Sequence, residues 1–173
     1  MKAFYADGGK VVLREVGEPH PGPGEILVRV RAAGLNAADR YVLDGSHISG
    51  PLVRAPVVPA VVPAAPLGSE AAGDVVAVGS GVASCAPGDR VMGTCAGAFA
   101  EMTTFRDGFF LKVPDNLSWT DAAAVPVTFV SAHDALTGAG GLTPGATVLV
   151  NAASSGVGVA ALQLARVLSL IHI

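Results

Sequence analysis

The sequence predicts an α+β domain followed by the beginning of an α/β unit. Three observations carry this prediction. Short strand-like runs separated by turns fill the first two thirds of the chain, as in a small, mostly antiparallel barrel. An apolar helical stretch follows Ser118, and near the C-terminus a short buried strand leads through small residues into an amphipathic helix. We expect the two domains to cover residues 1–117 and 118–173.

Composition excludes several classes of protein. The chain has 173 residues, of which 51% are hydrophobic and 14% are charged, with a net charge of −3. Such a chain has a packed interior rather than a disordered tail, and it has no basic surface for nucleic acid. Asp7 and Gly8 interrupt the start before a signal-peptide core forms, and the prolines between residues 55 and 69 exclude a membrane helix there. We expect a cytoplasmic protein without a nucleic-acid or membrane partner.

The cysteines and histidines do not predict a metal site. Cys85 and Cys95 form no Cys-x-x-Cys pair, and the four histidines are scattered along the chain. Two ordinary thiols are the expected state. A disulfide between them is the alternative, and it is disfavoured in a chain without secretion signals.

Turn residues divide the first part of the chain into short elements. We expect strands over residues 10–16, 26–31, 74–78 and 90–92, a pair of strands over 99–105 and 109–113, and a helix over 36–43. Residues 46–66 repeat Pro, Val and Ala, and we interpret them as an extended, proline-stiffened loop because each proline removes a ladder donor.

The second part begins as a helix. Ser118 is a candidate N-cap, with Asp121 three residues later, and residues 122–136 are largely apolar. Pro126 predicts a kink or a split in this helix. After a glycine-rich break, residues 147–150 predict a strand and residues 156–167 a helix. The expected buried face of that helix consists of Val157, Ala160, Ala161 and Leu164.

The turn between this strand and this helix, residues 151–158, is a candidate phosphate-binding loop. Its alanines, serines and glycines let a backbone approach a pyrophosphate at a helix N-terminus. The strict Gly-x-Gly-x-x-Gly pattern is absent, so a tight turn that merely packs is the alternative. The residue that distinguishes NAD from NADP is expected about 20 residues further on, at or beyond Ile173.

Several spaced motifs together resemble a known family. They are Gly34-Leu35-Asn36-Ala37-Ala38-Asp39-Arg40-Tyr41, Gly68-Ser69-Glu70-Ala71-Ala72-Gly73-Asp74, Gly88-Asp89-Arg90-Val91 and Ala152-Ala153-Ser154-Ser155-Gly156-Val157-Gly158. In this order they resemble the quinone oxidoreductase (zeta-crystallin-like) branch of the medium-chain dehydrogenases/reductases. The resemblance implies a GroES-like barrel followed by the first βα unit of a Rossmann domain. It also implies hydride transfer from NADPH, or NADH, to a quinone, enone or aldehyde in a homodimeric parent enzyme.

The resemblance also implies roles for individual residues. Zinc-dependent relatives carry Cys and His where this chain has Asn36 and Ser69, so we expect a reaction without zinc. Asn36 and Tyr41 are expected near the nicotinamide and substrate. Tyr41 is a candidate hydrogen-bond or proton donor, with simple packing as the alternative. Glu70 is expected to be a structural hydrogen-bonding group. The expected cofactor-binding residues are Asn36, Thr128, Ser131, Ser154, Ser155, Gly156, Val157 and Gly158.

Two other functions remain as alternatives. One is an alcohol dehydrogenase-like enzyme that has lost zinc, and the other is a non-catalytic GroES-like module. The phosphate loop disfavours the second alternative, because such a module has no need of it. A hydrolase is disfavoured because no Gly-x-Ser-x-Gly elbow is present.

Residues 168–173 interrupt the dehydrogenase-like pattern, and we expect them not to be native. Their sequence, Leu-Ser-Leu-Ile-His-Ile, is what the transposon-end codons CTG TCT CTT ATA CAC ATC of sequencing adapters encode. Whether or not the tail is native, we expect the strand at 147–150 to lack both neighbouring strands, and we expect a fragment that aggregates and does not bind NAD(P)H measurably. Genomic sequence beyond the Val167 codon tests the hypothesis of a non-native tail: an open dehydrogenase-like frame supports it, and a native stop codon contradicts it.

Overall fold

The structure, a computed structural model, describes residues 1–44 and 65–172. Contacts divide the chain into two compact units, Met1–Ala124 and Val125–Ile173. The division falls later than the expected boundary at residue 117, because the short helix α2 belongs to the first unit. Its residues Ala122 and Ala123 are buried, and α2 packs against strands β3 and β5.

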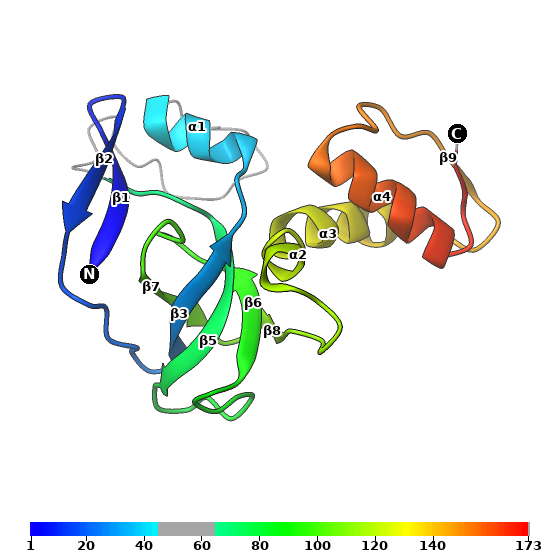
Figure 1. The fold of residues 1–173 in the computed structure, drawn as a ribbon. Coiled ribbons are helices and arrows are strands. Elements are labelled where there is room, and N and C mark those ends of the chain that lie inside the picture. Colours follow the sequence, from blue (N-terminus) through cyan, green and yellow to red (C-terminus); the bar gives the residue numbers. More distant parts are fainter. Residues whose placement is uncertain (45–64, 173) are drawn as a thin grey trace. The chain divides into compact units, whose positions relative to one another are not determined.

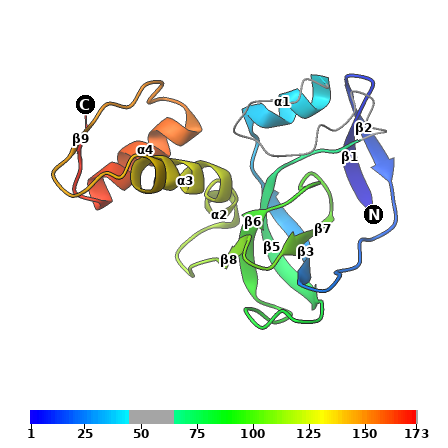
Figure 2. The same ribbon diagram turned by 180° about the vertical axis from the view of Figure 1, so that it is seen from behind.

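The first unit is built mainly of antiparallel strands (Figures 1 and 2). Its elements are β1 (Lys2–Asp7), β2 (Lys10–Glu15), β3 (Glu25–Ala33), α1 (Ala37–Asp44), β4 (Ala65–Pro66), β5 (Glu70–Val78), β6 (Arg90–Thr94), β7 (Met102–Arg106), β8 (Phe110–Lys112) and α2 (Trp119–Ala123). One sheet has the order β2-β1-β4 and a curled sheet has the order β7-β3-β5-β6-β8. Most of the expected 46–66 loop lies outside the described residues, and its last two residues form β4.

The core of this unit confirms the alternation that the sequence predicts for Val28 and Val30 with Arg29 and Arg31, but not for the start of the strand. In β3, Arg29 and Arg31 are exposed and Val30 between them is partly buried, but the three residues before them, 26–28, are all buried. Two of these three, Ile26 and Val28, are fully buried. They pack with the fully buried Phe105 of β7 and with Val91 of β6. Burial of a side chain of this size stabilises the folded state by roughly 1.5–3 kcal/mol. The curled sheet therefore surrounds one apolar interior.

The strands expected at 99–105 and 109–113 are present in shortened form as β7 and β8, but they do not pair with each other. In the curled sheet β7 pairs with β3 and β8 pairs with β6, so they form opposite edges. The sequence predicts the two strands but not their partners, because a turn between neighbouring segments does not by itself determine strand pairing. The curl still brings their aromatic rings near each other, with Phe105 and Phe110 ring centroids 6.4 Å apart.

Helix α2 begins where the sequence predicts and is clamped to the sheet. The Ser118 hydroxyl accepts a hydrogen bond from the Asp121 backbone N–H at 3.1 Å, which confirms the N-cap. The Arg90 guanidinium lies 4.3 Å from the centroid of the Trp119 ring and donates a hydrogen bond to the Leu117 carbonyl. Strand β6 therefore anchors the start of this helix through one arginine.

The second unit contains the expected strand, turn and helix. Its elements are α3 (Pro126–His133), the π-helical segment η1 (Asp134–Ala139), β9 (Thr147–Val148), α4 (Gly156–Val167) and β10 (Ile171–His172). Pro126 starts α3, so the proline splits the predicted helix, as its missing N–H allows at a first helical position. Alanines 132, 160, 161 and 165 pack with Leu136 and Leu170 to form the core of this unit.

The prediction of the buried face of α4 was partly wrong. The buried residues of the helix are Gly158, Ala160, Ala161 and Ala165, whereas Val157 is 41% exposed. The buried face therefore lies about one position further along the chain than predicted. It is formed by small residues because they allow close packing of α3 and α4, whose backbones are in extensive contact.

The strand at 147–150 does have a neighbour, contrary to the expectation. After α4, Ser169 adopts a left-handed conformation with φ 57°, the role expected of a glycine cap. The chain then turns back, Leu170 N–H donates to the Ala165 carbonyl at 2.8 Å, and β10 pairs in parallel with β9. Residues of the tail that was expected to be non-native thus complete the first βαβ crossover. Among the helices of the two described ranges, none has the length and hydrophobicity needed to cross a bilayer.

Candidate functional site

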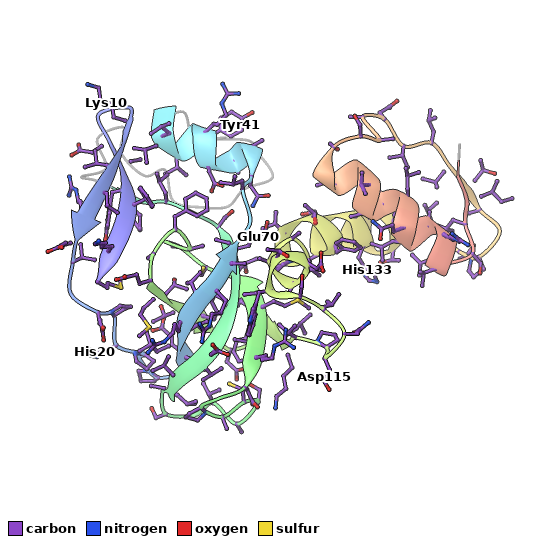
Figure 3. The ribbon with its side chains drawn as sticks, viewed as in Figure 1. Lys10, His20, Tyr41, Glu70, Asp115 and His133 are labelled. Atoms are coloured by element: carbon purple, nitrogen blue, oxygen red, sulfur yellow. The ribbon has the colours of Figure 1, made fainter. Side chains whose placement is uncertain are left out.

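In the first unit the candidate site lies where β3 ends and β5 begins. Ala33 is paired with Ala71 in the antiparallel register of these strands. The Gly34 N–H extends this pairing by donating to the Glu70 carbonyl at 3.2 Å. The segments around residues 34–36 and 69–70 are therefore adjacent, although they are distant in the sequence. Figure 3 shows Glu70 among the strands at this point.

Three polar side chains meet at this junction. The Asn36 amide nitrogen, Nδ2, donates to Glu70 Oε1 at 2.7 Å and to Ser69 Oγ at 3.2 Å. Glu70 is only 2% exposed, and hydrogen bonding compensates a buried carboxylate for its lost hydration. Glu70 is therefore a buried hydrogen-bonding group, as the sequence predicts.

Gly34 has a role that was not predicted from the sequence. A Cβ atom at this position would collide with the Glu70 carboxylate, and it would also lie 2.7 Å from Glu70 Cγ. Only glycine leaves room for the carboxylate beside the chain that leads to Asn36. The available signal was a glycine immediately before a loop that carries a polar side chain, which often marks a close approach.

Tyr41 lies on α1 and is 42% exposed. In Figure 3 its side chain projects from the helix, away from Glu70. Among the residues that the structure describes, the Tyr41 hydroxyl has no hydrogen-bond partner. With 42% of its surface exposed, the Tyr41 side chain is open to solvent.

The thiol of Cys95 lies close to the same junction. The Cys95 N–H donates to the Ser69 carbonyl at 3.0 Å. Burial raises the pKa of the Cys95 thiol to about 11, a hydrogen bond with Thr103 lowers it, and the negative charge of Glu70 raises it further. Cys95 is therefore a neutral, weakly reactive thiol at neutral pH, and both cysteines are free thiols. Within residues 1–44 and 65–172, no three potential metal ligands are clustered.

The second unit carries the candidate phosphate loop at the start of α4. Ser155 is the N-cap, and its hydroxyl accepts a hydrogen bond from the Gly158 N–H at 3.0 Å. Ala152 adopts φ 53°, which turns the chain sharply out of β9. In the described part of the chain, the N–H groups of Gly156 and Val157 and the Ser154 hydroxyl have no partners. These exposed donors at the positive end of a helix of 12 residues fit a phosphate group.

Gly158 holds this loop against its own helix. A Cβ at this position would collide with the Ala152 carbonyl oxygen and would lie 2.7 Å from Ala153 Cα. Thr128 of α3 also borders the loop, since a Cβ at Gly156 would lie 3.1 Å from its Cγ2 atom. The structure thus brings Thr128 to the predicted loop. Ser131 is exposed further along α3, and no described contact joins it to the loop.

Comparison with known proteins identifies the family. The model of the alcohol dehydrogenase GroES-like domain matches residues 22–115, which contain the whole curled sheet. The chain belongs to this family. The finding confirms the barrel expected from the motifs, as well as the resemblance to medium-chain dehydrogenases/reductases. Asn36, Ser69, Glu70 and Tyr41 all lie within the matched range.

Relatives extend the similarity into the second unit. The chain is 43% identical over 143 residues to erythronolide synthase EryA2 of Saccharopolyspora erythraea, covering 83% of this chain and 4% of that protein. It is 40% identical over 161 residues to the synaptic vesicle membrane protein VAT-1 homolog of Rattus norvegicus, covering 92% and 37%. The quinone oxidoreductase of Thermus thermophilus, solved alone and with NADPH, matches with a TM-score of 0.80 and 34% identity, covering 99% and 52%. The chain thus spans about half, or less, of the length of these proteins.

We expect that Gly158→Ala destabilises the second unit by roughly 1–3 kcal/mol, because the added methyl group meets backbone atoms that cannot rotate away. Chemical denaturation monitored by circular dichroism measures this change. Gly17→Ala is the matched control, since nothing lies within 4 Å of a Cβ built at Gly17. Equal stability of the two variants would contradict the close approach of Gly158 to the loop.

The raised pKa of Cys95 predicts a pH dependence. Its ordinary value is 9.0, so between about pH 9 and pH 11 the thiol ionises in the unfolded chain but not in the folded one. The contribution of Cys95 to stability is therefore constant below pH 9 and falls as the pH rises towards 11. Iodoacetamide should accordingly modify Cys95 far more slowly at pH 8 in the folded chain than in urea. Equal rates in the two states would contradict the burial of this thiol.

Proposed function

We propose that this chain supplies the catalytic domain and the first nucleotide-binding unit of a zinc-independent oxidoreductase that transfers hydride from NADPH to quinones, enones or related carbonyl compounds. The observation that carries the proposal is the loop at the start of α4. Its N–H groups at Gly156 and Val157 and its Ser154 hydroxyl are exposed and open to an anion. The proposal is also supported by a quinone oxidoreductase whose structure was solved with NADPH, and which is similar to 99% of this chain.

The cofactor-binding role rests on the loop residues. Gly156 and Val157 would donate backbone hydrogen bonds to a phosphate oxygen, and the α4 dipole would favour the negative charge. Ser154 would add a hydroxyl donor, while Ser155 holds the helix start by capping Gly158. Thr128, which borders Gly156, and Ser131, on the same helix α3, would face the nicotinamide end of the cofactor.

Independence from zinc is supported by the chemistry of the Asn36 junction. A zinc ligand offers a lone pair, as thiolate, imidazole and carboxylate do. The Asn36 amide nitrogen instead directs its hydrogens at Glu70 and Ser69, at 2.7 and 3.2 Å. The Asn36 amide hydrogens thus occupy Glu70 Oε1 and Ser69 Oγ, and a positively charged ion does not fit where these hydrogens point. Without a Lewis acid, an acceptor that is already polarised is the favoured substrate.

The reaction then requires one proton from the protein or from water. When bound, the dihydronicotinamide supplies a hydride, which with one proton reduces a quinone to a hydroquinone. Tyr41 is the proposed donor to the substrate oxygen, because its hydroxyl is accessible and has no described partner. The protein that contains this chain would act as a homodimer on small molecules in the cytoplasm.

The test uses the protein encoded by the complete reading frame that contains this segment. We expect NADPH oxidation, followed at 340 nm, with a panel of quinones and enones, and no change on addition of EDTA. Tyr41→Phe should lower kcat by about 10- to 100-fold if the phenol donates the proton. Tyr5→Phe, on the separate strand β1, is the matched control and should leave the rate unchanged.

Two outcomes would contradict the proposal. Oxidation of alcohols with NADP⁺ that is lost on chelation would indicate a zinc-dependent alcohol dehydrogenase. Absence of NADP(H) binding to the folded full-length protein would favour a non-catalytic GroES-like module.

A further inference from the structure

The Asn36 side chain does not cap helix α1, although its position in the chain would allow it to. Asn36 immediately precedes α1, where an asparagine side chain commonly caps the first turn. Here a side chain inside the helix makes the capping contact: Asp39 Oδ2 accepts a hydrogen bond from the Asn36 backbone N–H at 2.8 Å. The Asn36 amide points instead to the junction of β3 and β5.

Glu70 determines which way the Asn36 amide faces. A carboxylate accepts hydrogen bonds and does not donate them, so the amide nitrogen and not the amide oxygen must face Glu70 Oε1 at 2.7 Å. The second amide hydrogen is directed at Ser69 Oγ, at 3.2 Å. Both donors of Asn36 are thereby occupied. Glu70 has little freedom to move, because it is 2% exposed and the Gly34 backbone packs against its side chain.

One polar atom of the amide remains. Within the described residues Asn36 Oδ1 has no hydrogen-bond partner, and the residue is only partly buried. The atom is an acceptor only. A quinone or enone oxygen is also an acceptor, so it gains no hydrogen bond from Asn36 Oδ1. A ligand group that carries N–H or O–H does.

We infer that Asn36 is an acceptor-only recognition group whose Oδ1 binds an N–H or O–H donor of the ligand, and that Glu70 is the positioning residue that sets this polarity. The identity of the ligand rests on the proposed function. Two donors are available in that reaction: the carboxamide NH₂ of the nicotinamide, and the hydroxyl of the reduced product. The oxidised substrate carries neither, so its oxygen is left to the Tyr41 hydroxyl.

The positioning role is tested without any ligand. In the full-length protein labelled with ¹⁵N-asparagine, the Asn36 side-chain amide should exchange with solvent slowly, and its signal is assigned by its loss in Asn36→Ala. Asn116 and Asn151 are exposed internal controls. Glu70→Gln is nearly isosteric but presents a donor as well as an acceptor, so the Asn36 amide should exchange at least about tenfold faster. An unchanged Asn36 signal in folded Glu70→Gln would overturn the positioning role.

The recognition role is tested by calorimetry with ligands that lack the donor. The 3-acetylpyridine analogue of NADP⁺ has a methyl group in place of the carboxamide NH₂. If the cofactor is the donor, the wild-type protein should prefer NADP⁺ by roughly fivefold to tenfold, as for one neutral hydrogen bond. Asn36→Ala should remove that preference, and Asn116→Ala should retain it.

If the product is the donor, a hydroquinone should bind more tightly than its dimethyl ether to the wild-type protein but not to Asn36→Ala. Either preference supports the acceptor role and identifies its source. Absence of both preferences in a protein that binds NADP⁺ would overturn it. A protein that does not bind NADP⁺ but keeps the slow Asn36 amide exchange would contradict the proposed function, and with it the identity of the ligand. The positioning effect of Glu70 would still be demonstrated.

Discussion

The antiparallel pairing of β3 with β5 is the constraint on which the candidate site depends. It places the chain that leaves β3 against the start of β5, and so brings Asn36 within hydrogen-bonding distance of Glu70 and Ser69. Close backbone approach makes this possible, because side chains at Gly34 and Gly73 would collide with Glu70 and with the Arg29 backbone. The same two strands bury Ile26, Val28 and Val75 in the core. The geometry of the polar junction is therefore coupled to the packing of the barrel, and a rotation of the Asn36 segment would require a change in the sheet.

Much of the fold was predictable because local signals and tertiary structure agree. Alternation in residues 28–31, the Ser118 cap, the split at Pro126 and the bounds of α4 each follow from local chemistry. Strand partners were not predictable in the same way. Residues 99–113 contain two strand-like runs, yet whether they pair with each other or with β3 and β6 depends on how the sheet curls, and no local pattern encodes the curl. The shift of the buried face of α4 has a similar origin, since Val157 and Gly158 both satisfy helical periodicity, and the close approach of the loop backbone at Ala152 and Ala153 buries Gly158.

The candidate site was predictable as a set of residues but not as a set of interactions. The motifs singled out Asn36, Ser69 and Glu70 separately, and the loop at 151–158 as a unit. The Asn36 amide points to Ser69 and Glu70 and does not cap α1. This direction depends on contacts between segments that lie more than 30 residues apart in the sequence. The role of Ser169 was not predictable from its residue type, because φ 57° is uncommon for serine and the position usually holds glycine.

The close contact of Gly158 with Ala152 and Ala153 has a consequence for the energetics of anion binding. The loop keeps its shape through backbone packing and the Ser155 cap, both of which exist in the absence of ligand. A phosphate arriving at the start of α4 would meet donors that are already aligned, so little conformational entropy would be lost when it binds. The loop residues therefore differ in how well they tolerate substitution. A serine hydroxyl in the loop can be replaced by a threonine hydroxyl, but any side chain at Gly158 would collide with the backbone of Ala152 and Ala153.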